Sequence, residues 1–207
     1  GFYRDGSFIQ HDIHPSTAGY GASQLSTMAP MISWLAGSTW AVTDPALANI
    51  YQWVYRSYEP IIYQGAAMDF VRGREITRSS SSPQSVGHGI MDSILRLAQF
   101  APPADAARMK SMVKHWAQKD TIRNFVSGRS LSMLAPARAL MADASIIPRG
   151  ELLGHFTFAS MDRVVHLGQG YGFGLSMSSS RIARFESING ENLRGWFTGE
   201  GVATLYN

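Results

Sequence analysis

A histidine and a tyrosine nine residues apart are the first side chains in this sequence whose types suggest chemistry. His11 and Tyr20 lie in the opening stretch, and Arg72, Arg74 and Arg78 follow within residues 68–78. An imidazole and a phenol can both transfer protons. Guanidinium groups bind carboxylates through paired hydrogen bonds. Together these side chains suggest proton transfer on an acidic substrate.

Each of these residues also has an ordinary structural explanation. A loop histidine is most often exposed or structural, and a tyrosine near the start of a helix is most often a half-buried packing residue. The arginines have acidic neighbours, Asp69 and Glu75, with which they could form ion pairs. The residue types alone therefore leave catalysis and simple packing both open.

The composition narrows the classes of protein and partner. The chain has 207 residues, of which 45% are hydrophobic and 16% charged, with a net charge of +3 and a pI of about 9.3. A low content of charged residues is common in secreted carbohydrate enzymes, so we expect an extracellular protein. Four of the 18 basic residues, Arg56, Arg72, Arg74 and Arg78, fall in one short stretch, and such a local patch favours an acidic ligand over duplex DNA. We therefore expect no nucleic-acid partner. No apolar run is long enough to span a membrane, so we expect no membrane partner either.

Metal and thiol chemistry have no support in the sequence. There is no cysteine, which excludes a disulfide framework, a thiolate nucleophile and a Cys-based zinc site. The histidines outside the opening stretch lack metal-ligand spacing such as HExxH. The segment 168–174 is rich in glycine but precedes a predicted strand rather than a helix, so it does not fit a nucleotide-binding loop. We predict no metal and no cofactor.

The elements that must position these residues are helical at first. Ser16 or Thr17 can cap a helix that runs to about residue 35. Asp44-Pro45 starts an amphipathic helix that ends near residue 59. Further helices are expected from residue 83, from residue 103, and over residues 122–126 and 131–141.

After Pro148 the pattern changes to that of strands. Strands are expected over residues 155–158, 163–166, 171–177 and 181–186, and again at the end of the sequence. Residues 171–178 alternate large apolar with small residues, which is typical of a half-buried strand. We predict two domains, a helical one over residues 1–147 and an antiparallel one over residues 148–207. The sequence begins inside a motif and ends inside a predicted strand, so we expect a segment of a longer polypeptide.

Three blocks of this sequence resemble polysaccharide lyase family 8, which includes hyaluronate, chondroitin AC and xanthan lyases. The spacing of His11 and Tyr20 resembles the family's catalytic loop, residues 68–78 resemble its arginine motif, and residues 161–207 resemble the start of its central β domain. The resemblance implies the C-terminal part of an (α/α) toroid followed by the start of an antiparallel β-sandwich domain. It also implies that the protein cleaves an acidic polysaccharide by β-elimination at a uronate. The expected substrate is hyaluronan or chondroitin, and xanthan is the alternative.

The resemblance also implies roles for individual residues. Tyr20 carries out the proton transfer, His11 lies beside the substrate carboxylate, and Arg74 and Arg78 favour the phenolate form of the tyrosine. Arg72 is expected to bind substrate. The family's catalytic asparagine and an aromatic patch lie upstream of this sequence, so the rest of the same polypeptide is an expected partner.

Two asparagines of the predicted β domain are further candidates for substrate binding. Asn189 and Asn192 are expected to face the cleft, although a turn at Asn189-Gly190 explains the first equally well.

Two other functions compete with elimination. Glycoside hydrolysis normally needs two carboxylates, for which Asp5 and Asp12 are the candidates. A glycan-binding segment without catalysis is the other, and it is what we expect of this segment by itself, because the upstream asparagine is missing from it.

Overall fold

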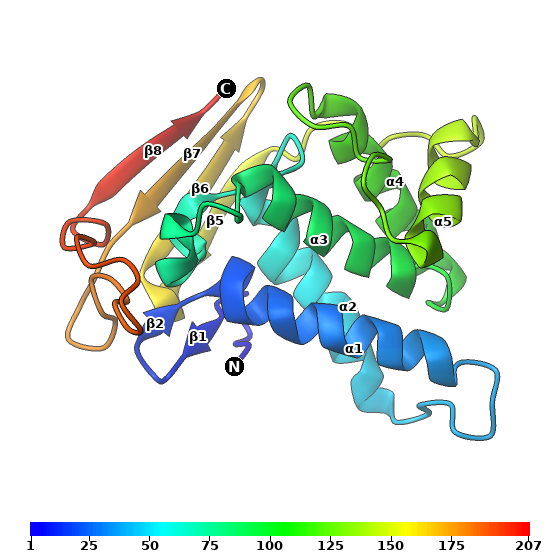
Figure 1. Cartoon of the computed structure of the whole chain (residues 1–207), viewed down its shortest axis with the longest axis horizontal. Helices are drawn as coiled ribbons and strands as arrows, with labels where there is room; N and C mark the ends of the chain where they lie inside the picture. Colours follow the sequence, from blue (N-terminus) through cyan, green and yellow to red (C-terminus); the bar gives the residue numbers. More distant parts are fainter.

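The computed structural model describes residues 1–207 and shows a helical part followed by one antiparallel sheet (Figure 1). The helices are α1 (Ala22–Leu35), α2 (Ala48–Trp53), α3 (Pro83–Leu97), α4 (Pro103–Lys119) and α5 (Leu131–Ala142). The sheet consists of β5 (Gly154–Phe158), β6 (Arg163–Gly168), β7 (Tyr171–Ser176) and β8 (Val202–Tyr206), in that spatial order. None of the helices combines the length and apolar character needed to cross a membrane.

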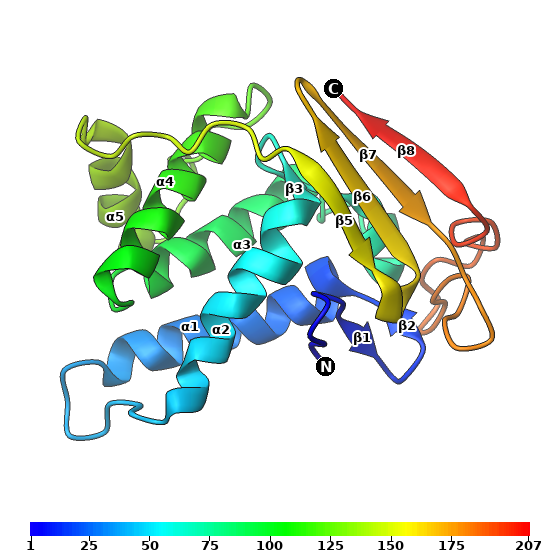
Figure 2. The same ribbon diagram turned by 180° about the vertical axis from the view of Figure 1, so that it is seen from behind.

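Two short hairpins lie within the helical part. Strands β1 (Ile9–Gln10) and β2 (His14–Pro15) form the first, and β3 (Ile62–Tyr63) and β4 (Ala66–Ala67) form the second. The first hairpin lies below one end of the large sheet, next to the start of α1 (Figure 2). It therefore brings the N-terminal loop to the junction between helices and sheet.

Local signals set where most helices begin. The Asp44 carboxylate accepts a hydrogen bond of 2.8 Å from the Ala46 amide, directly before Pro45. The Ser82 hydroxyl accepts one of 3.1 Å from the Ser85 amide, directly before the first residue of α3. These contacts satisfy amide groups that the first helical turn leaves free. The predicted helices from residues 45, 83, 103 and 131 are confirmed, the first as a mixed 3₁₀, α and π segment up to Ile61.

The helix predicted over residues 122–126 is wrong, because the chain forms bends and turns there. The Asp120 carboxylate accepts hydrogen bonds of 2.9 Å from the amides of Ile122 and Arg123. The Asn124 side chain does the same for Val126 at 2.8 Å. Such short-range bonds compete with helical pairing and favour turns.

The strand predicted over residues 181–186 is also wrong. Ser176 of β7 pairs directly with Val202 of β8, so residues 177–201 form a long loop outside the sheet. Because β8 occupies the edge of β7, the loop is free to fold back toward the helical part. Its Ala183 amide donates to the Ile13 carbonyl at 3.0 Å, which joins the loop to the first hairpin.

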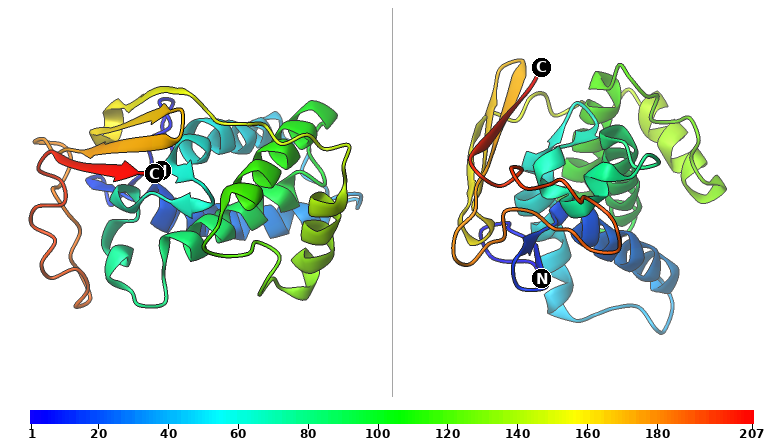
Figure 3. Two further views of the ribbon diagram at one scale, coloured as in Figure 1. Left: turned by 90° about the horizontal axis from the view of Figure 1, so that it is seen from above. Right: turned by 60° about the vertical axis from the view of Figure 1, so that its left-hand side comes forward.

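The sheet packs one face against the helical part, as the two views in Figure 3 show. Buried residues of β6, such as Val165 and Leu167, join one hydrophobic cluster with residues of α1, α3 and α4. A side chain at Gly174 of β7 would overlap the Phe70 ring, so the glycine lets that part of the helical region approach the sheet. Both parts thus share a core, and the division at residues 147 and 148 stays a prediction.

Candidate active site

Tyr20 lies in a π-helical turn, Thr17–Gly21, that leads directly into α1. The Ser16 hydroxyl caps this turn by accepting a hydrogen bond of 3.2 Å from the Tyr20 amide. A side chain at Gly21 would press on the Phe8 ring, so the turn can lie close to the first hairpin. The half-buried tyrosine therefore has a fixed backbone and an accessible ring.

His11 lies at the exposed tip of the first hairpin, between β1 and β2. Both His11 and Asp12 have left-handed backbone conformations, with φ of 49° and 65°. The tight turn points the imidazole toward Tyr20, and the ring centroids are 5.8 Å apart with the planes at 85°. The structure thus places the two residues of the opening motif next to each other.

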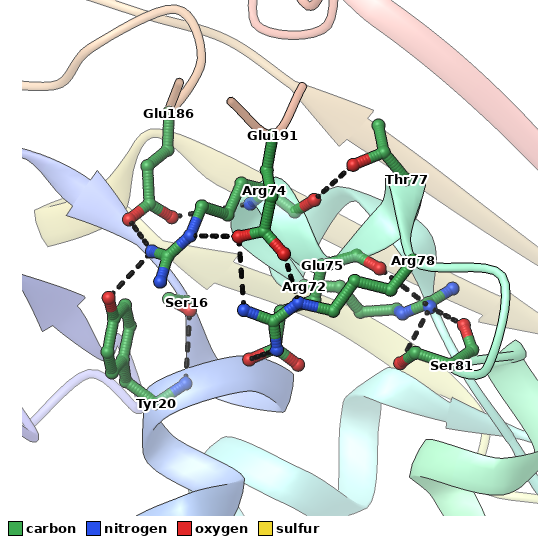
Figure 4. A network of polar contacts seen from close by, with 10 residues as sticks. All are labelled: Ser16, Tyr20, Arg72, Arg74, Glu75, Thr77, Arg78, Ser81, Glu186 and Glu191. Carbon is green, nitrogen blue, oxygen red and sulfur yellow. Dashed lines mark hydrogen bonds and ion pairs between the residues drawn. The ribbon is translucent and has the colours of Figure 1, made fainter. Parts of the chain in front are cut away.

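Arg74 connects Tyr20 to the loop between β7 and β8 (Figure 4). Its guanidinium donates to the Tyr20 hydroxyl at 2.6 Å and to the Glu191 carboxylate at 2.5 Å, and it also pairs with Glu186. The hydrogen bond to Tyr20, together with those to the two carboxylates, raises the pKa of Arg74 above its ordinary value. A permanently cationic donor on a phenolic oxygen stabilises negative charge on that oxygen.

Arg78 shares the Glu191 carboxylate with Arg74. Its Nε donates to Glu191 at 2.5 Å, its Nη2 donates to the other oxygen at 3.1 Å, and its Nη1 lies 3.0 Å from Glu75. Hydrogen bonds from Arg78 and then Arg74 lower the pKa of Glu191 to about 2. The pair of guanidiniums and the carboxylate between them are therefore all charged at neutral pH.

The structure gives Arg72 a supporting position and corrects the expectation that it binds substrate. Its side chain is 2% exposed, and its guanidinium pairs with Asp69 and the Ser81 carbonyl. Both partners belong to the segment that carries the other two arginines. Arg72 therefore fixes the shape of that segment and has no free surface for a ligand.

Asn189 and Asn192 stabilise the loop that carries Glu186 and Glu191. Asn189 and Gly190 form a turn with φ of 57° and 75°, closed by a hydrogen bond of 3.1 Å from the Glu191 amide to the Ile188 carbonyl. The buried Asn192 amide donates to the Glu186 carbonyl at 2.9 Å. Asn189 is exposed, and its role in substrate binding stays a prediction.

The sequence reasoning missed both glutamates. Glu186 and Glu191 lie more than 100 residues from the arginines, in a segment expected to be a strand in part. One signal was available: the arginine segment has three cations but only Asp69 and Glu75 as neighbouring anions, which leaves one guanidinium without a local partner.

An open hollow lies beside the two arginines that share Glu191. It has a volume of about 840 Å³ and is lined mainly by residues 76–80 and 190–195. The charged residues on its wall are Arg78, Glu191 and Arg194. The structure contains no group of three His, Cys, Asp or Glu side chains placed to hold a metal ion. The wall of this hollow is therefore both polar and charged.

The carboxylates considered for hydrolysis do not form a pair across this hollow. Asp5 accepts hydrogen bonds from the amides of Ser7 at 3.0 Å and Ser160 at 2.7 Å. Burial opposes ionisation of Asp5, but these amide bonds outweigh it and lower its pKa. Asp5 therefore serves the backbone and lacks the raised pKa of a general acid.

Comparison with known proteins gives two family matches along the chain. Residues 1–115 match the polysaccharide lyase family 8 N-terminal alpha-helical domain, and residues 153–207 match the polysaccharide lyase family 8 super-sandwich domain.

Individual relatives match the chain over nearly its whole length. A Paenibacillus xanthan lyase structure is 49% identical with a TM-score of 0.98, covering 100% of this chain and 20% of its own. A Streptomyces coelicolor chondroitin AC lyase structure, in complex with chondroitin sulphate, is 34% identical with a TM-score of 0.95, covering 100% of this chain and 29% of its own.

A hyaluronate lyase from Thermasporomyces composti is 40% identical over 204 residues, which are 98% of this chain and 26% of that protein. The chain thus spans about a fifth to a third of the length of these relatives.

Proposed function

Because the chain belongs to polysaccharide lyase family 8, we propose that the full-length protein cleaves an acidic polysaccharide by β-elimination at a uronate. The observation that carries this proposal is the hydrogen bond of 2.6 Å from Arg74 to the Tyr20 hydroxyl, with the His11 ring centroid 5.8 Å from that of the tyrosine. Such an arrangement suits a phenolic oxygen that accepts and returns a proton.

In the proposed reaction Tyr20 removes the proton from C5 of the uronate. The C5–H electrons form the C4=C5 double bond, the C4–O bond breaks, and the proton passes from the tyrosine to the departing O4. Arg74 stabilises the phenolate that exists before Tyr20 takes up the C5 proton and again after it has passed the proton to O4, because its charge and hydrogen bond favour an anionic oxygen. His11 orients the substrate carboxylate from the exposed tip of the first hairpin.

The remaining parts of the proposal concern the rest of the protein. We propose that the helical part belongs to an (α/α) toroid and that the sheet belongs to a β-sandwich. An asparagine from the upstream part of the polypeptide would donate hydrogen bonds to the same carboxylate. We also propose that the protein acts outside the cell, where such polymers occur. The segment by itself would then bind glycan without turnover.

The choice of polymer is a separate proposal. Hyaluronan and chondroitin are the substrates proposed from the sequence, and the hyaluronate and chondroitin AC lyases among the relatives support them. Xanthan is the second candidate, favoured by the 49% identity to a xanthan lyase. All three polymers carry uronates, so the same proton chemistry serves each of them.

The decisive experiment follows ultraviolet absorbance of the conjugated double bond while the full-length protein digests each polymer. We expect absorbance to rise with at least one polymer and to vanish in Tyr20→Phe, which keeps the ring but removes the hydroxyl. New reducing ends without absorbance would mean hydrolysis and would refute the proposal. Absence of product from all three polymers would favour glycan binding without catalysis.

A further inference from the structure

The arginines expected to bind an acidic substrate are already fully paired with acids. Arg74 and Arg78 face the carboxylates of Glu75, Glu186 and Glu191, so two cations meet three anions. The cluster has no surplus positive charge with which to attract a polyanion. A substrate carboxylate can reach these guanidiniums only if one of the resident carboxylates moves away.

Glu191 is the resident carboxylate that is most exposed to solvent. The Glu186 side chain is 4% exposed and also accepts a hydrogen bond of 3.3 Å from the Arg74 amide. The Glu191 side chain is 25% exposed, and its carboxylate contacts only the two guanidiniums. Unlike Glu75, which contacts Arg78 alone, it occupies the position between both arginines.

The backbone around Glu191 can stay in place while its side chain moves. The Glu191 amide donates to Ile188 at 3.1 Å, and the Ser187 hydroxyl donates to the Glu191 carbonyl at 3.1 Å. These bonds hold the turn but leave the side-chain torsions free. Since Glu191 lines the open hollow of about 840 Å³, a change of rotamer would move the carboxylate toward solvent.

We propose that the Glu191 carboxylate occupies the place of a substrate carboxylate between Arg74 and Arg78 and is displaced when the acidic polymer binds. Glu191 thereby sets the affinity for the polymer, because every binding event must first break its ion pairs. The inference rests on the proposed function, since the displacing group is the carboxylate of the acidic polysaccharide.

The test compares Glu191→Gln with Glu200→Gln in the full-length protein. Glutamine keeps the size of the side chain but weakens its hold on the guanidiniums. Glu200 lies in the same loop and pairs with the exposed Arg184, so its variant makes the same change in net charge away from the hollow. Rates are measured by absorbance with hyaluronan, chondroitin and xanthan at low and high salt. Binding of each polymer is measured in a Tyr20→Phe background.

We expect Glu191→Gln to lower KM about two- to fivefold, an ordinary range for one partly exposed ion pair. We also expect kcat to change less than about twofold and KM to depend more steeply on salt, since the arginines then carry surplus charge. The Tyr20→Phe background should show the same gain in affinity. Glu200→Gln should leave KM unchanged.

Three results would overturn the inference. A fall in kcat at constant KM would make Glu191 a positioning residue for Arg74. An unchanged or higher KM would mean that the carboxylate is not displaced. An equal effect of Glu200→Gln would indicate general electrostatics. If the wild type produces no absorbance, the proposed function fails, yet tighter binding in the Tyr20→Phe background would still support displacement of Glu191.

Discussion

Replacing Glu186 by glutamine should slow the reaction without weakening substrate binding. The buried Glu186 carboxylate pairs with the Arg74 guanidinium and also accepts a hydrogen bond of 3.3 Å from the Arg74 amide. A glutamine can offer its oxygen to only one of these donors, and its own NH₂ group then faces the other. Arg74 would lose part of the support that aims it at the Tyr20 hydroxyl.

The size of the effect follows from the kind of bond that is lost. A hydrogen bond to a charged group contributes about 1.5–3 kcal/mol. Since about 1.4 kcal/mol corresponds to a factor of ten in rate, kcat should fall about 10- to 150-fold if the loss appears entirely in the transition state. KM should change little, because Glu186 is buried and does not line the open hollow.

The assay is the rise in ultraviolet absorbance with the full-length protein, fitted for kcat and KM. Glu59→Gln is the matched control: Glu59 is a buried carboxylate that pairs with Arg108 at 2.9 Å and Arg149 at 3.4 Å, with no contact to Tyr20. It should lower stability but leave kcat unchanged. If Glu186→Gln kept kcat within about twofold while Tyr20→Phe abolished it, the link between Glu186, Arg74 and the phenol would be refuted.

Three further changes test the frame around the site. Arg163→Met should lower the free energy of unfolding by about 3 kcal/mol, as measured by denaturant titration. The reason is that the buried Arg163 guanidinium donates to the Phe70 carbonyl at 3.3 Å and to three other carbonyls, which would all lose this donor. Gly174→Ala should cost about 1–3 kcal/mol by overlap with the Phe70 ring, and Gly89→Ala, which has open space, is its control in the same titration.

Burial, with Arg149 and then Lys119 nearby, lowers the pKa of His115 to about 4. The unfolded histidine titrates near 6.5, so stability present above that pH should fall by about 3 kcal/mol toward pH 4. Denaturant titration of His115→Gln should show a flatter pH dependence.

Short-range signals explain why much of the fold could be predicted. Asp44-Pro45 and Ser82-Pro83 start helices through capping bonds between residues two or three positions apart, which the sequence displays directly. The alternation in β7 likewise reflects neighbouring residues on opposite faces of one strand, although the buried face carries the small residues Gly172, Gly174 and Ser176 rather than the large apolar ones. The two failures, at residues 122–126 and 181–186, concern short segments where turn-forming bonds or pairing with a distant strand decide the outcome.

The site was predictable in its residue types but not in its connections. The sequence names His11 and Tyr20 as candidates, and the structure adds that a hairpin turn brings their ring centroids to 5.8 Å. It cannot show that Glu186 and Glu191 reach the arginines, because their approach depends on a loop that leaves the sheet after β7 and returns at β8. Long-range charge pairing of this kind follows from tertiary structure rather than from any local pattern.

The acidic partners of the arginines limit how strongly these arginines can attract a polyanionic substrate. Three free guanidiniums would attract any polyanion, as expected from the sequence, but Arg72 is buried against Asp69 and the other two are paired with glutamates. Binding must then exchange one carboxylate for another, which costs little net electrostatic energy and selects for a ligand of matching geometry. Arg74 can thus keep its hydrogen bond to Tyr20 whether or not substrate is present, because the buried Glu186 stays when Glu191 leaves.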